Sequence, residues 1–142
     1  MTIHRHTTQI LALAAMGALL QGCAPTPSGP PARLFEADFK GAAKTCQTPK
    51  PDTIPGKTID ASMKVGSDGG WCGLQVTHGG RPFDAELLTV RPEHGKVYVH
   101  RVGNDTRIDY TPDAGFIGAD AFTVQLLPGD ASVHVVVTAV AH

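Results

Sequence analysis

The chain of 142 residues has little cysteine, few aromatic side chains and no long hydrophobic run. Its cysteines are Cys23, Cys46 and Cys72, and Phe, Trp and Tyr make up 6% of the residues. The longest apolar stretch, residues 10–20, is about half the roughly twenty residues that a bilayer-spanning helix needs. We therefore expect no permanent membrane-spanning helix.

An excess of basic residues is also missing, because 12 Lys and Arg stand against 13 Asp and Glu. Nucleic-acid-binding proteins carry a strong basic excess, so we expect no nucleic acid partner. Beyond residue 22 there is no Gly-x-Ser-x-Gly, Cys-x-x-Cys or His-x-His motif. The sequence therefore supports no catalytic residue and no cofactor.

The N-terminal residues have the order of an export signal. Residues 2–9 are polar and include Arg5, the apolar run 10–20 follows, and no acidic residue precedes Cys23. The run ends in Leu20-Gln21-Gly22-Cys23, which resembles the lipobox of bacterial lipoproteins, although Gln21 stands where a small residue is usual. The alternative is a plain secretory signal with an incidental cysteine.

The lipobox resemblance implies an order of domains and a location in the cell. Residues 1–22 would be a cleaved lipoprotein signal peptide, and Cys23 would carry the lipid that anchors the protein to a membrane. The Pro-rich residues 23–32 would form a tether, with one domain over 33–142. Ala24, in place of an aspartate, favours the outer membrane, facing the periplasm or the surface, over the inner membrane of the cell envelope.

Cys46 and Cys72 are expected to form a disulfide. In the sequence 25 residues lie between them, and an exported protein meets an oxidising compartment. A reactive or metal-binding pair is the alternative. It is disfavoured because neither cysteine has a second cysteine or a histidine at ligand spacing.

The second half of the chain predicts an all-β sandwich of about seven strands. Short runs of β-branched and aromatic residues alternate with Gly, Pro, Asn and Asp clusters from Lys57 onward. Within the strands, alternation assigns residues such as Tyr110 and Phe122 to the core. Residues 33–44 fit a short helix or an irregular strand, and 47–57 fit a loop. The expected strands are 58–65, 73–77, 85–90, 96–102, 107–111, 121–127 and 132–140, the last of them buried on both sides.

Residues 84–140 contain two motifs that resemble bacterial Ig-like and cadherin-like surface modules. Residues 92–95 read PEHG, and residues 110–122 read YTPDAGFIGADAF. The resemblance implies an immunoglobulin-like antiparallel β-sandwich with an N-terminal extension, in which Tyr110 and Phe122 anchor the core.

The histidines and aspartates give no clear metal site. The histidines after residue 22 stand singly, and we expect isolated surface positions. Four aspartates near the Ig-like motifs are expected to be solvated rather than calcium ligands, since calcium needs six or more converging oxygens. The residues concerned are His78, His94, His100, His134 and His142, and Asp105, Asp109, Asp113 and Asp120.

The glycine-rich stretch 66–81 supplies the candidate ligand contacts, which are Trp71, His78 and Arg81. Trp71 could stack on a sugar or a peptide, or it could pack on the expected disulfide, as a tryptophan does in immunoglobulin sandwiches.

The leading hypothesis is a non-catalytic, lipid-anchored Ig-like module that binds another envelope component, a protein or a polysaccharide. Two alternatives remain, which are a periplasmic metal-binding or redox protein and a structural subunit of an envelope complex. The hypothesis rests on the resemblance to Ig-like modules and on the expected location in the cell envelope, and a fold by itself does not establish function.

Overall fold

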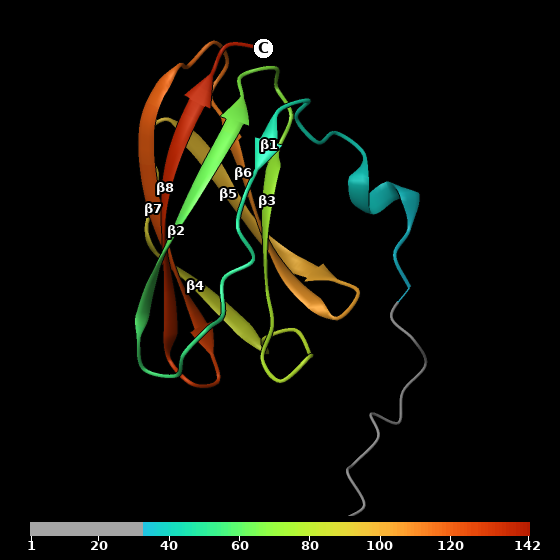
Figure 1. Cartoon of the computed structure of the whole chain (residues 1–142), viewed down its shortest axis with the longest axis vertical. Helices are drawn as coiled ribbons and strands as arrows, with labels where there is room; N and C mark the ends of the chain where they lie inside the picture. The colour runs from blue at the N-terminus through green and yellow to red at the C-terminus, as the bar shows by residue number, and fades with distance from the viewer. Residues whose placement is uncertain (1–32) are drawn as a thin grey trace, which may run out of the picture. The chain divides into compact units, whose positions relative to one another are not determined.

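A computed structural model describes residues 33–142 as two β-sheets packed face to face (Figure 1). One sheet has the strand order β1-β2-β8-β7-β4 and the other the order β3-β6-β5. The predicted all-β sandwich is confirmed, with eight strands rather than about seven, because Cys46–Gln47 adds a two-residue strand. The strands are β1 (Cys46–Gln47), β2 (Thr58–Gly66), β3 (Cys72–Val76), β4 (Ala85–Val90), β5 (Gly95–Val102), β6 (Asp105–Pro112), β7 (Gly118–Leu127) and β8 (Ala131–Val140).

One strand pair departs from the predicted antiparallel arrangement. Strands β2 and β8 run parallel, with Thr58 opposite Ser132 and Gly66 opposite Val140, whereas the other pairs are antiparallel. Alternation could not reveal the parallel pairing, because side chains alternate with the same period of two in parallel and antiparallel strands.

The core lies between the sheets and follows the predicted alternation. Phe122 on β7 and Tyr110 on β6 are fully buried, and their rings stack with centroids 5.8 Å apart. The expectation that β8 is buried on both sides is wrong. Val135 and Val137 face the core, but Val136 between them is 47% exposed because nothing among residues 33–142 covers the outer face of this sheet there.

The glycine of the PEHG motif, Gly95, makes room for the Tyr110 ring. A Cβ atom at Gly95 would lie 2.5 Å from the Tyr110 ring, closer than any carbon contact allows. Only glycine therefore lets the tyrosine ring lie against the start of β5, which explains why a glycine follows His94.

The predicted disulfide between Cys46 and Cys72 is present, with a Cα–Cα distance of 5.2 Å. It joins β1 of the five-stranded sheet to β3 of the other. The closed loop spans 26 residues, so loop-closure entropy corresponds to about 3 to 4 kcal/mol of stabilisation.

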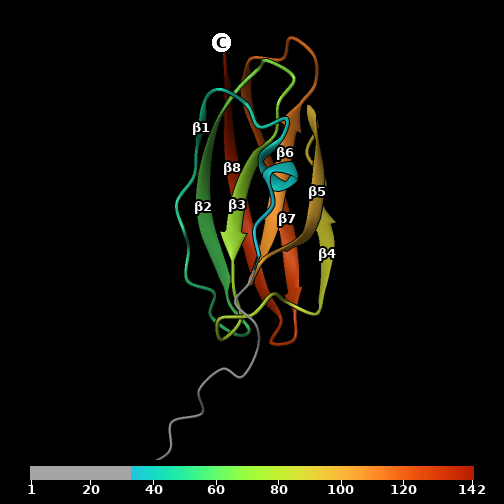
Figure 2. The same ribbon diagram turned by 90° about the vertical axis from the view of Figure 1, so that its right-hand side faces the viewer.

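Of the two forms expected for residues 33–44, the structure has the short helix, which is the single 3-10 turn η1 (Glu36–Phe39). The Asp38 carboxylate accepts a hydrogen bond from the Phe35 backbone N–H at 2.7 Å and closes the turn. Residues 48–57 form the expected loop between β1 and β2. The segment around η1 passes in front of the three-stranded sheet in Figure 2.

Candidate functional site

Two charged residues lie nearly buried on the outer face of the three-stranded sheet. Because Ile108 and Tyr110 face the core, Arg107 and Asp109 of β6 face outward, yet each is only 5% exposed. Asp109 Oδ2 accepts hydrogen bonds from Arg107 Nε at 3.2 Å and Nη2 at 3.0 Å, and Oδ1 lies 2.9 Å from Nε. The expectation that Asp109 is solvated is therefore wrong.

A glycine on the neighbouring strand makes room for this ion pair. Gly73 of β3 lies opposite Asp109, and a Cβ atom there would come within 2.6 Å of Asp109 Oδ1. The glycine thus lets the carboxylate and the Arg107 stem lie flat on the sheet. This close approach could not be inferred from the sequence, where Gly73 lies in the glycine-rich stretch and begins the expected strand 73–77.

His100 extends the ion pair toward solvent. Its Nε2 lies 2.9 Å from Asp109 Oδ2, and its side chain is 25% exposed. The ring of Tyr98, which is 65% exposed, lies beside it with centroids 4.8 Å apart. The prediction that His100 is an isolated surface histidine is therefore wrong.

Trp71 packs on Arg107 and holds the N-terminal segment. The Arg107 guanidinium lies 4.0 Å from the centroid of the indole ring, within the range of a cation–π interaction. The indole N–H donates to the Lys40 carbonyl at 3.0 Å, and Arg107 Nη1 donates to the Asp38 carbonyl. We call Trp71, Arg107 and Asp109 the clasp, because the first two bind the segment by its backbone and the third balances the Arg107 charge.

Main-chain hydrogen bonds continue the attachment. The Trp71 N–H donates to the Gly41 carbonyl at 3.1 Å, and the Ala43 N–H donates to the Trp71 carbonyl at 2.8 Å. The contacts of Trp71 are thus with Arg107 and residues 40–43. The disulfide was predicted as a packing partner of Trp71, and Cys72 of that disulfide directly follows Trp71 in the chain.

The structure does not bring the three candidate ligand contacts together. Trp71 precedes β3, whereas His78 and Arg81 follow it and pair with each other across a tight turn. His78 follows Trp71 by seven positions of mostly extended chain, which correspond to about 23 Å at roughly 3.3 Å per residue. The His78 ring packs on Phe83 instead, with centroids 5.5 Å apart.

Asp120 is a second aspartate that the sequence wrongly assigned to solvent, since it is 8% exposed. Its Oδ1 accepts hydrogen bonds from the N–H groups of Glu93 and Ala121, and its Oδ2 from the N–H of His94 and the hydroxyl of Tyr110, at 2.8 to 3.0 Å. Asp120 therefore ties β7 to the PEHG turn.

The same contacts set two pKa values. Burial alone would raise the pKa of Asp120, but the four hydrogen bonds outweigh it and hold the pKa below its ordinary value of 3.8. Burial and the hydrogen bond to Asp120 raise the pKa of Tyr110 far above its ordinary value of 10.0. Tyr110 therefore stays a donor and Asp120 an ionised acceptor. Asp113, by contrast, is exposed as predicted.

The rings of two other histidines each contact one neighbouring side chain. The His94 ring stacks on Phe116 with centroids 4.3 Å apart, and His134 Nδ1 lies 3.1 Å from Thr123 Oγ1. Over residues 33–142, no three His, Cys, Asp or Glu side chains are grouped so that they could hold a metal ion.

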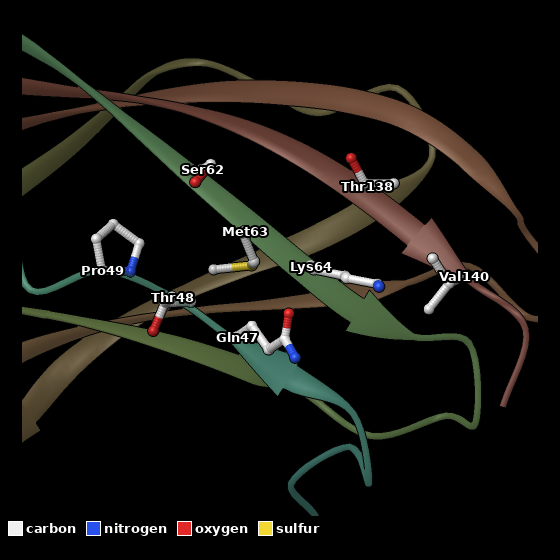
Figure 3. A pocket seen from close by; sticks show the side chains of 8 residues that line it. All are labelled: Gln47, Thr48, Pro49, Ser62, Met63, Lys64, Thr138 and Val140. Atoms are coloured by element: carbon white, nitrogen blue, oxygen red, sulfur yellow. The ribbon is translucent and has the colours of Figure 1, made fainter.

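A pocket of about 530 Å³ lies where β1, β2 and β8 meet (Figure 3). Ser62 and Thr138 contribute hydroxyl groups to it, and Lys64 a positive charge. The lining offers hydrogen bonds to a polar ligand but no carboxylate or histidine for acid–base chemistry. The sequence did not indicate it, because it depends on the parallel pairing of β2 with β8. The lining residues are Gln47, Thr48, Pro49, Ser62, Met63, Lys64, Thr138 and Val140.

Large apolar side chains are exposed on two edge strands. Strands β4 and β5 each end a sheet, and Figure 2 shows them along the same side of the sandwich. Ten large apolar side chains are at least 36% exposed in the described part of the chain, and four of them lie on these strands. The four are Leu87, Leu88, Val90 and Tyr98.

Comparison of the chain with protein-family models, curated proteins and solved structures gives no match. Cys23 lies outside the described residues. Within residues 33–142, no helix has the length and hydrophobicity needed to cross a bilayer.

Proposed function

We propose that the protein is a non-catalytic, lipid-anchored module of the bacterial cell envelope that binds another envelope component. The component is a protein or a polysaccharide, and the surface that binds it is the edge formed by β4 and β5. The observation that carries the proposal is the exposed apolar edge of β4.

Strand β4 is little protected as a sheet edge, apart from a bulge between Leu88 and Val90. One of its edges pairs with β7 and the other is free. Glu86 is its only charged residue, while Leu87 and Val90 are each 51% exposed. Edge strands of monomeric proteins are usually shielded by charges, prolines or covering segments, so an uncovered apolar edge is typical of an interaction site. An added strand from a protein partner would satisfy the free backbone groups, which favours a protein over a polysaccharide.

A photo-crosslinking amino acid at position 87 tests the binding surface in intact cells. We expect a crosslinked adduct from position 87 and none from position 60, because Asp60 is exposed on β2, away from the β4 edge. Immunoblotting followed by mass spectrometry would identify the adduct. Equal adducts from both positions, or none from position 87, would exclude the β4 edge as the binding surface.

The anchor is tested by Cys23→Ser. We expect the variant to leave the membrane fraction and to lose incorporation of labelled fatty acid, since two acyl chains suffice for stable anchoring and a protein without them has no such attachment. Cell fractionation and lipid labelling measure the two effects, with Asp84→Asn, at an exposed side chain outside the lipobox, as the control. A Cys23→Ser protein that keeps its label would refute the anchor.

A further inference from the structure

The segment of residues 34–39 exposes three large apolar side chains, although the clasp holds its C-terminal end on the sheet. Leu34, Phe35 and Phe39 are 57%, 62% and 54% exposed. An isolated domain would gain free energy by turning such side chains toward its own surface. Here the sheet instead binds the backbone, through the carbonyls of Asp38 and Lys40.

The position of this segment in the chain indicates what covers it. Arg33 follows Cys23 by ten positions, and ten residues of chain span at most about 36 Å. A lipid on Cys23 would therefore keep residues 34–39 close to the bilayer at all times. Arg33 and Lys40, which flank the segment, are balanced by Glu36 and Asp38 within it, so the exposed apolar side chains rather than charge favour the contact with the membrane.

We propose that Leu34, Phe35 and Phe39 insert into the interfacial region of the membrane that carries the lipid anchor, so that the clasp fixes the orientation of the domain on the bilayer. The inference rests on the proposed lipid anchor at Cys23 and adds a second contact to it. Binding at the interface grows with the apolar area that is buried, and aromatic and aliphatic side chains supply that area here. The orientation leaves the β4 edge, on another part of the domain, to the protein partner.

Fluorescence quenching by brominated lipids tests the insertion. The lipidated protein is purified in detergent and reconstituted into vesicles of phosphatidylethanolamine and phosphatidylglycerol, with or without bromine on the acyl chains. A tryptophan reporter is introduced by Phe39→Trp, by Phe35→Trp as a second reporter, and by Leu87→Trp as a matched control of similar exposure on β4. The wild-type protein gives the Trp71 background.

We expect brominated lipid to lower the added emission of Phe39→Trp and Phe35→Trp on the order of twofold, and to leave that of Leu87→Trp unchanged. A lipidated, vesicle-bound protein whose Phe39→Trp and Phe35→Trp emissions are quenched no more than that of Leu87→Trp would overturn the inference and leave the anchor standing. This is also the result expected if a protein partner covers the segment. An intact mass without lipid would overturn the anchor and the inference together.

Discussion

Replacing Arg107 by methionine is expected to lower the free energy of unfolding by about 3 to 5 kcal/mol, the usual effect of removing one partner of a buried ion pair. Methionine keeps an apolar stem against Trp71 and removes only the charge and its hydrogen bonds. Asp109 would then remain almost buried, with His100 as its remaining side-chain partner, and its Oδ1 already has no hydrogen bond of its own. Urea unfolding followed by circular dichroism measures the change.

Two variants complete the test. Arg107→Met combined with Asp109→Leu should recover most of the lost stability, because replacing a buried ion pair by apolar residues is often neutral. Arg101→Ala is the matched control, since this arginine is 60% exposed and lies 4.0 Å from Asp84 in an exposed pair worth under about 1 kcal/mol. A double variant as unstable as the single one would mean that the charge of Asp109 is not the cause of the loss.

The sequence predicted most of the sandwich because alternation is a local property. The side chains of Phe122 and Val124 lie where a period of two places them, and the turn residues around Gly103 and Gly129 fall between strands. The disulfide was also predictable, since the chain offered Cys46 a single plausible partner once Cys23 was assigned to lipid. These features depend on neighbours in sequence or on very few alternatives.

The clasp could not be predicted, because it depends on contacts distant in sequence. Alternation correctly placed Arg107 and Asp109 on the outer face of β6, and an outer face normally meets water. They are buried because residues 38–43 pass over this face. Asp38, whose carbonyl accepts the hydrogen bond from Arg107, lies 69 residues before Arg107 in the sequence. A run of alternating residues contains no information about such a cover.

Asp120 was missed for a different reason. It precedes Ala121 in a glycine-rich connection, where aspartates commonly remain in water. The signal was present in the resemblance to Ig-like modules, whose motif contains both the tyrosine and the aspartate. Tyr110 and Asp120 are ten residues apart and hydrogen bonded at 2.8 Å, so their joint presence indicates a structural pair.

Replacing Asp120 by alanine is expected to lower the free energy of unfolding by about 4 to 6 kcal/mol at neutral pH. Four donors would lose their acceptor, and each hydrogen bond to a charged group contributes about 1.5 to 3 kcal/mol. The full sum is not reached, because water can enter the loosened turn around His94. Asp84→Asn, at a side chain that is 82% exposed, is the control and should change the stability by less than about 0.5 kcal/mol.

The stabilisation by Asp120 should also depend on pH, and Asp120→Asn isolates this dependence. Because the folded-state pKa lies below the ordinary value of 3.8, the ionised carboxylate stabilises the fold fully above about pH 5. Its contribution is lost as the pH falls through 3.8 toward the lower folded-state pKa, where protonation makes the carboxyl group resemble the neutral amide. The difference in free energy of unfolding between wild type and Asp120→Asn should therefore be constant from about pH 5 to 7 and should shrink steadily toward pH 2. Urea unfolding at a series of pH values measures it, and a difference that stays constant down to pH 2 would show that the charge of Asp120 does not stabilise the turn.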